Sequence, residues 1–274
     1  GVLAVSGADR RTWLNGMATC DLSKLAPGAG AYGLCTGKNG KILAEFWLTQ
    51  DRDRLLLGVH KTRIPGLLEH FNRYIMMEDT EVEDVSDTLR VVFIHGPRHT
   101  EGLKIAQTQP GVVAGADIQS SELGTAALVI ETGHLSDVRE GLARAMGESF
   151  YIPSQEAWEA LRIEAGIPRF GVDFDEQNYP QEASLERYAV SFQKGCYLGQ
   201  EAVFMLEARG HAKKRLVKIQ VEGEAGADGL QAGTVLGVAQ EGGGVEDVGA
   251  LTSIADTDGG AVALGYVKYK HART

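Results

Sequence analysis

The order of the apolar segments constrains the fold of this chain more than any other feature of its sequence. Between residues 54 and 147 the pattern predicts a strand, a helix, a short strand, a strand, a helix, two strands and a helix. After Gly210 the pattern changes, because short β-type segments then follow one another with glycine-rich turns between them. We therefore predict an α+β protein with a mixed, ferredoxin-like part in its middle and a small C-terminal β-barrel or β-sandwich.

Periodicity and flanking residues give the bounds of the single elements. Residues 31–48 predict a β-hairpin in which Asn39 and Gly40 form a type I′ turn, with positive φ at both residues. Asp9 opens one predicted helix, and Ser154 caps another. The remaining predicted helices span 61–77, 97–107 and 136–146, and the remaining predicted strands span 2–6, 55–59, 90–95, 125–131, 216–221, 234–238, 248–253 and 261–269.

Charge and cysteine content limit the classes of function. The chain has 274 residues and a formal net charge of -10, so contact with nucleic acid needs a local basic patch. Its three cysteines are widely spaced, which argues against a disulfide framework and favours a cytoplasmic protein. No apolar run approaches the length of a membrane span. The strand-like start without a methionine predicts that the native chain begins earlier.

Two patterns have plain structural interpretations. Residues 28–33 match the dinucleotide fingerprint G-x-G-x-x-G, but a hairpin and not a helix follows them, so we predict an ordinary turn. The seven histidines lack the spacing of metal ligands, and we predict no metal site.

Residues 194–201, with the sequence Lys-Gly-Cys-Tyr-Leu-Gly-Gln-Glu, combine a candidate nucleophile with groups that can tune it. An ammonium group such as that of Lys194 lowers the pKa of a nearby thiol and raises its thiolate fraction. Cys196 is therefore a candidate catalytic residue, with Lys194 as its activator. The alternative, an inert buried cysteine, stays open on this chemistry alone.

A basic cluster stands out in this acidic chain. It is either a solvated turn before a strand or a cradle for an anion, such as a polyglutamate tail or an RNA phosphate. Its members are Arg209, His211, Lys213, Lys214 and Arg215.

Several blocks along the chain, taken together, resemble a known family. They occur in the family's order at residues 5–9, 13–16, 19–21, 37–43, 161–168, 179–185, 194–201, 209–210 and 214–216. The sequence resembles the YgfZ-type folate-binding proteins, which are paralogues of the glycine-cleavage T-protein, the tetrahydrofolate-dependent aminomethyltransferase. Residues 194–201 are the most specific block.

The resemblance implies a three-module ring with folate in its central hole. The implied modules are a discontinuous N-terminal folate-binding module of residues 1–52 and 151–208, a ferredoxin-like module of residues 53–150 and a C-terminal β-barrel of residues 209–274. The implied cofactor is tetrahydrofolate or a one-carbon derivative. Glu182 matches the carboxylate that binds the pterin ring, and Arg215 matches a basic position near the glutamate tail. The further expected folate contacts are Tyr197, Gln200 and Glu45.

Departures from the family separate the functional hypotheses. Aminomethyltransferases carry an Asp-Asp pair where this chain has Ala44 and Glu45, and loss of such a group typically costs 10² to 10⁴ in rate. Cys20 and Ser184 stand where the family usually has asparagine. We therefore favour a folate-dependent accessory protein that supports iron–sulfur client proteins and tRNA modification, with Cys196 as a thiolate. The alternatives are an aminomethyltransferase with a lipoyl-protein partner and a non-catalytic RNA-contacting module that uses residues 209–215.

Overall fold

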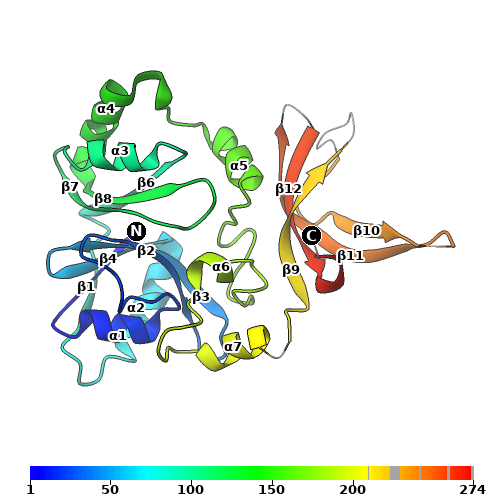
Figure 1. Cartoon of the computed structure of the whole chain (residues 1–274), viewed down its shortest axis with the longest axis horizontal. Coiled ribbons are helices and arrows are strands. Elements are labelled where there is room, and N and C mark those ends of the chain that lie inside the picture. The colour runs from blue at the N-terminus through cyan, green and yellow to red at the C-terminus, as the bar shows by residue number, and fades with distance from the viewer. Residues whose placement is uncertain (209, 223–228, 241, 258–259, 273–274) are drawn as a thin grey trace. The chain divides into compact units, whose positions relative to one another are not determined.

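A computed structural model describes residues 1–208, 210–222, 229–240, 242–257 and 260–272 (Figure 1). Arg209, a member of the predicted basic cluster, lies outside the described residues. The chain divides into two compact units. Unit 1 comprises Gly1–Ile152 and Tyr188–Gln200, and unit 2 comprises Pro153–Arg187 and Glu201–Thr274. Each unit is described by itself.

Unit 1 contains two antiparallel sheets. The first has the order β2-β3-β4-β1-β5 and the second the order β6-β8-β7. The strands are β1 (Val2–Ser6), β2 (Ala31–Thr36), β3 (Ile42–Asp51), β4 (Arg54–Val59), β5 (Glu81–Asp84), β6 (Leu89–His95), β7 (Val112–Asp117) and β8 (Thr125–Glu131). The helices are α1 (Arg10–Met17), α2 (Ile64–Asn72), α3 (His99–Ala106) and α4 (Leu135–Met146), with 3₁₀ turns at Lys61–Arg63, Thr132–His134 and Gly147–Ser149.

The two sheets of unit 1 pack face to face, with a pair of helices on each outer side (Figure 1). Alternate residues of β1 take part in two cores, as a period of two requires. Leu3 and Val5 pack with α1 and α2, whereas Val2 and Ala4 face the second sheet. Helices α3 and α4 cover the far side of that second sheet. Central strands are therefore buried on both faces, which explains their nearly continuous apolar sequences.

Unit 2 is built on a four-stranded antiparallel sheet with the order β10-β11-β12-β9. The strands are β9 (Lys214–Val221), β10 (Val235–Ala239), β11 (Val245–Thr257) and β12 (Gly260–Lys268). Helix α5 (Gln155–Glu164) packs on this sheet through Ile163, which joins Leu216, Val262 and Leu264 in one core. Two short helices, α6 (Glu186–Ala189) and α7 (Gln200–Ala208), span two of the points in the sequence at which the units divide, and a 3₁₀ turn at Tyr269–His271 follows β12. Within the described residues the sheet is open, because no pairing joins its edge strands β10 and β9.

The predicted order of elements between residues 54 and 147 is confirmed, as are the helix that follows Ser154 and the four C-terminal strands. Residues 28–33 lead into β2, which confirms the predicted plain turn. The predicted type I′ turn is wrong: Gly40 has a φ of 76°, whereas Asn39 is not among the residues with positive φ. Strand pairing ends at Thr36 and Ile42, so a five-residue connection links β2 to β3.

The helix predicted over residues 61–77 ends earlier, at Asn72. The carboxylate of Glu78 accepts hydrogen bonds from the backbone N–H groups of Met76 and Met77, at 2.9 and 3.0 Å. These bonds hold a loop where the apolar pattern suggested a further helical turn. None of the described helices is both long enough and apolar enough to cross a membrane.

Candidate functional site

The predicted site residues fall in both units. Unit 1 contains Glu45, Lys194, Cys196, Tyr197 and Gln200, and unit 2 contains Glu182 and Arg215. No group of three or more potential metal-ligating side chains occurs in the described part of the chain.

The ammonium group of Lys194 lies in a cage of backbone carbonyls. It donates to the oxygens of Asn15 at 2.6 Å, Ala18 at 2.7 Å and Cys20 at 2.8 Å. These three bonds use all of its donors. Its side chain is buried, with 9% exposed, and this burial lowers the pKa of Lys194 to about 8. Lys194 therefore fastens residues 194–201 to the end of α1, and no described hydrogen bond or ion pair joins it to Cys196.

The rest of the 194–201 segment is anchored to α1 and to the end of β2. The N–H of Leu198 donates to the carbonyl of Gly16 at 2.9 Å, and the hydroxyl of Thr36 donates to the carbonyl of Leu198 at 2.6 Å. Gly199 has a φ of 85°, and a side chain there would overlap the carbonyl oxygen of Gly37. The glycine is thus required by close approach of two backbones.

Between these anchors the segment presents one exposed and one buried polar side chain. The thiol of Cys196 is exposed, unlike those of Cys20 and Cys35. The side chain of Tyr197 is buried, and its hydroxyl has no hydrogen-bond partner among the described residues. Burial raises the pKa of Tyr197. The amide of Gln200 donates to the carbonyl of Gly195 at 3.3 Å, which closes the loop around Cys196. The exposed thiol is available to reagents, in contrast to the inert buried cysteine considered from sequence.

Glu45 lies on β3 with its side chain buried. The hydroxyl of Tyr32 donates to its carboxylate at 2.7 Å, and burial together with this carboxylate raises the pKa of Tyr32. Ala44 belongs to the core that packs with α1 and α2. Adjacent residues of a strand point to opposite faces, so Ala44 and Glu45 do not present a pair of side chains to one site.

We expect Lys194→Met to loosen the segment around Cys196. The variant leaves three carbonyl oxygens without their charged donor, and we expect the free energy of local opening to fall by about 1 to 2 kcal/mol. Amide hydrogen exchange measured by mass spectrometry should become roughly tenfold faster over residues 194–200. Lys24→Met, which removes an exposed lysine with 75% side-chain exposure, is the control. Unchanged exchange in Lys194→Met would contradict the anchoring role.

In unit 2, one oxygen of the Glu182 carboxylate is held by its own loop. Oε2 accepts from the backbone N–H of Tyr179 at 3.1 Å and from the side-chain amide of Asn178 at 3.4 Å. Oε1 has no hydrogen bond among the described residues. The hydroxyl of Tyr266 is buried without a partner, and its pKa is raised by burial and then by the negative charge of Glu182. The loop therefore orients a carboxylate with acceptor capacity left over.

Arg215 is already paired inside unit 2. Its guanidinium donates to the carboxylate of Glu186 through one nitrogen, Nη2. Burial raises the pKa of Glu186, and its second oxygen is buried without a partner. Arginine has five N–H donors, so Arg215 retains donors for a further anion.

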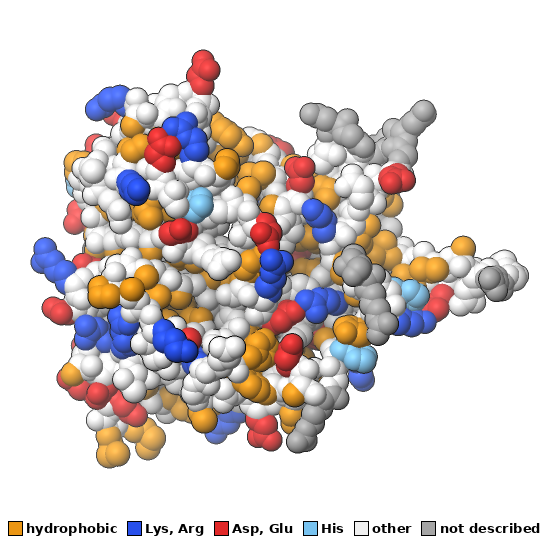
Figure 2. All heavy atoms as spheres, in the orientation of Figure 1, with side chains coloured by type: hydrophobic (Ala, Val, Ile, Leu, Met, Phe, Trp, Pro, Cys, Tyr) orange, Lys and Arg blue, Asp and Glu red, His pale blue; other side chains and the backbone are white. Residues whose placement is uncertain are grey.

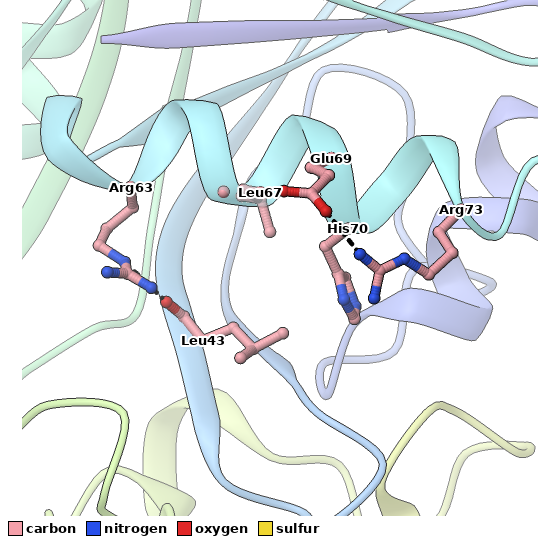
Figure 3. Close-up of a pocket in the computed structure, with 7 residues that line it drawn as sticks. Leu43, Arg63, Leu67, Glu69, His70 and Arg73 are labelled. Atoms are coloured by element: carbon pink, nitrogen blue, oxygen red, sulfur yellow. Dashed lines mark hydrogen bonds and ion pairs between the residues drawn. The ribbon is translucent and has the colours of Figure 1, made fainter.

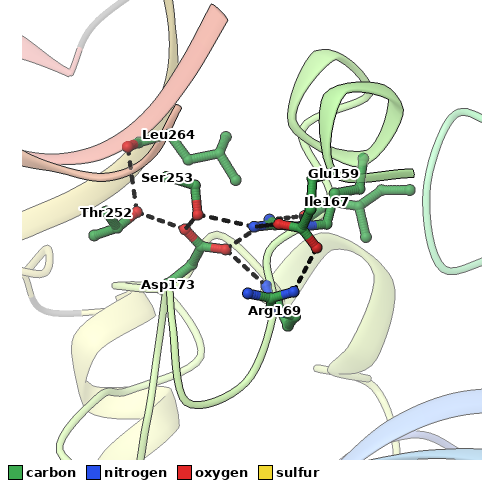
Figure 4. Close-up of polar contacts among 8 residues, drawn as sticks. Glu159, Ile167, Arg169, Asp173, Thr252, Ser253 and Leu264 are labelled. Atoms are coloured by element: carbon green, nitrogen blue, oxygen red, sulfur yellow. Dashed lines mark hydrogen bonds and ion pairs between the residues drawn. The ribbon is translucent and has the colours of Figure 1, made fainter. Parts of the chain in front are cut away.

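Sequence reasoning missed a buried polar network that joins α5 to β11 (Figure 4). Arg162, 2% exposed, donates to Glu159 at 2.7 Å, to Asp173 at 2.8 Å and to the hydroxyl of Ser253 at 2.9 Å. Asp173 also accepts from the hydroxyls of Thr252 and Ser253, each at 2.6 Å, and from a backbone N–H at 2.9 Å. The only signal in the sequence was that Arg162 lies in one of the family-like blocks.

Ser184, which stands where the family usually has asparagine, has an unusual backbone conformation. Ser184 has a φ of 58°, a conformation in which asparagine is several-fold enriched. Its hydroxyl donates to the carbonyl of Leu216 at 2.7 Å and fastens the loop to β9. The asparagine usual in the family would suit this backbone conformation, and the serine here is held by its hydrogen bond to β9.

A pocket of about 150 Å³ lies beside α2 in unit 1 (Figure 3). Arg73 donates to Glu69 at 2.6 Å, and Arg63 donates to the carbonyl of Leu43 at 3.0 Å. The Nε2 atom of His70 is buried without a partner, and burial lowers the pKa of this imidazole. None of the predicted site residues lines this pocket.

Comparisons with known proteins agree with the fold and with the blocks in the sequence. A family model described as the GCVT N-terminal domain matches residues 1–115. The tRNA-modifying protein YgfZ of Aliivibrio fischeri (strain ATCC 700601 / ES114) is 26% identical over 229 residues, which are 82% of this chain and 70% of that protein. The tRNA-modifying protein YgfZ of Hamiltonella defensa subsp. Acyrthosiphon pisum (strain 5AT) is 30% identical over 227 residues, which are 79% of this chain and 66% of that protein.

Among solved structures, the glycine cleavage system aminomethyltransferase T from Bartonella henselae is similar with a TM-score of 0.76. The match covers 98% of this chain and 76% of that chain at 20% sequence identity. A match at this level of identity shows that the two folds are similar. Residues 1–115 therefore match the GCVT N-terminal domain, and over most of its length the chain is similar to the YgfZ tRNA-modifying proteins. The resemblance seen in the sequence is thereby confirmed.

Proposed function

We propose that this chain is a folate-binding accessory protein that supports tRNA modification, and that it acts on iron–sulfur client proteins. The observation that carries the proposal is the Glu182 carboxylate, which its loop orients through one oxygen while the other has no hydrogen bond among the described residues. The 2-amino group and N3–H of a pterin offer two donors in one plane, which suit a carboxylate.

The side chains of unit 2 fit a folate in two further respects. Arg215 keeps N–H donors beyond the one that pairs with Glu186, as binding of a glutamate carboxylate needs. The unpartnered hydroxyl of Tyr266 is a buried polar group that a bound molecule could satisfy. When bound, tetrahydrofolate or a one-carbon derivative supplies one-carbon chemistry. In this proposal Glu182 and Arg215 hold it.

The three-module division is part of the same proposal. It assigns residues 53–150 to a ferredoxin-like module and residues 209–274 to a β-barrel, of which the open sheet of unit 2 would be the main part. The names of the YgfZ relatives support a role in tRNA modification, and the similar solved structure supports the fold of a glycine cleavage system aminomethyltransferase.

The accessory role can be tested through the exposed thiol of Cys196. We expect the wild-type chain to restore the modified nucleosides in tRNA of a bacterial strain that lacks its own YgfZ, measured by mass spectrometry of digested tRNA. We expect Cys196→Ala to fail in this assay while folate binding is retained, because only the reactive group is lost. Cys35→Ala, which changes a buried thiol, is the control. Full complementation by Cys196→Ala would exclude a role for the thiol, and failure of the wild-type chain would exclude the accessory role.

A further inference from the structure

A group of exposed basic side chains on unit 2 has no part in the proposed folate binding. It consists of His211, Lys213 and Lys214, which lie before β9 and at its start, and of Lys268 and Lys270, which lie at and after the end of β12. Strand pairing places Lys214 opposite Lys268. The N–H of Tyr269 donates to the carbonyl of Lys213 at 2.9 Å. Two segments far apart in sequence thus form one surface, which we call the basic face.

Positive charge on the basic face is only partly balanced. Like charges directly opposite each other on paired strands repel, as Lys214 and Lys268 do here. The ammonium of Lys214 lies 4.3 Å from the centre of the Tyr266 ring. Glu246 accepts from Lys268 at 3.4 Å and from Lys270 at 2.7 Å, and these ammonium groups lower the pKa of Glu246 to about 2.

Among the described side-chain contacts of this face, Glu246 is the one carboxylate, and it contacts Lys268 and Lys270 but not Lys213 or Lys214. The surface drawn in Figure 2 otherwise has acidic and basic side chains interspersed, and the whole chain carries a net charge of -10. A concentration of lysines in such a chain favours a polyanionic partner.

The basic face also carries two aromatic side chains. The rings of His211 and Tyr269 are stacked on each other, with centroids 3.8 Å apart and an angle of 18° between their planes. Aromatic side chains beside lysines are the groups on which proteins stack unpaired bases while they bind the adjoining phosphates. A lipid headgroup would use the lysines but would gain little from the stacked rings.

We propose that the basic face binds a single-stranded loop of tRNA, with its phosphates on Lys213, Lys214, Lys268 and Lys270 and a base on the Tyr269 ring. This inference rests on the proposed role in tRNA modification. It extends the RNA-contacting cluster predicted from residues 209–215 by adding the C-terminal segment, and it leaves Arg215, which pairs with Glu186, to the proposed folate site.

The test is binding of a fluorescently labelled tRNA transcript, followed by anisotropy at several salt concentrations. We expect saturable binding that weakens steeply with salt. Lys214→Ala combined with Lys270→Ala should weaken binding about tenfold or more and reduce the salt slope by about 1 to 2. Tyr269→Leu should weaken binding to an unstructured RNA oligonucleotide while it leaves the salt slope unchanged, because it removes stacking and no charge.

The control variant is Lys104→Ala combined with Arg139→Ala, which removes two exposed cations from unit 1. Equal tRNA binding by the control and the Lys214/Lys270 variant would overturn the inference, as would absence of binding at low salt. Binding to phosphatidylserine vesicles but not to tRNA would also overturn it. Folate titration of the same samples separates the two proposals, because loss of tRNA binding with folate binding intact refutes only the basic face.

Discussion

Replacing Asp173 by asparagine is expected to destabilise unit 2 by about 3 kcal/mol. Asp173 is fully buried and accepts from Arg162, from the hydroxyls of Thr252 and Ser253 and from a backbone N–H. Removal of its charge leaves the buried guanidinium with Glu159 as its remaining anionic partner. The amide group of asparagine also brings donors to places where Asp173 accepts hydrogen bonds, so donors then face donors.

The loss in free energy of unfolding is measured by urea denaturation followed through fluorescence. Hydrogen exchange over residues 155–164 is the local readout. Glu164→Gln in the same helix, α5, is the matched control, since that side chain is exposed and such surface changes usually stay within about 0.5 kcal/mol. A loss for Asp173→Asn no larger than that of the control would show that the network does not hold α5 to the sheet.

The second large effect concerns ligand affinity. Glu182→Gln is expected to weaken binding of tetrahydrofolate by about 10- to 100-fold, because hydrogen bonds to a charged group contribute about 1.5 to 3 kcal/mol. The glutamine keeps the shape of the side chain, and one of its atoms can still accept from the N–H of Tyr179. Loss of affinity would therefore report the missing charge rather than a collapsed loop. The melting temperature of the variant should change little.

The fold was largely predictable because its core follows local periodicity. Leu3 and Val5 alternate with Val2 and Ala4 between two cores, and this alternation marks β1 in the sequence. The turn at residues 37–41 was less predictable. Asn-Gly favours a two-residue turn, but the strands pair only as far as Thr36 and Ile42. The end of α2 was missed because Glu78, outside the apolar pattern, holds the following loop.

The site was predictable in its residue types but not in their contacts. The lysine in the 194–201 segment suggested an activated thiol, whereas its ammonium binds carbonyls about 175 residues earlier in the chain. Arg215 similarly appeared available from sequence, although Glu186 pairs with it. The stack of His211 on Tyr269 joins a residue before β9 to a residue after β12, and the two are far apart in the sequence. Such long-range pairs leave no periodic signal in a single sequence.

Calorimetric titration with tetrahydrofolate tests the central claim most directly. The wild-type chain, Glu182→Gln and Glu222→Gln are compared under identical conditions. The last variant removes an exposed carboxylate of unit 2 and is the charge-matched control. We predict saturable binding of one folate per chain to the wild type and to Glu222→Gln, and binding at least tenfold weaker to Glu182→Gln. No binding to the wild type, or equal affinity for Glu182→Gln and Glu222→Gln, would contradict the proposed folate site.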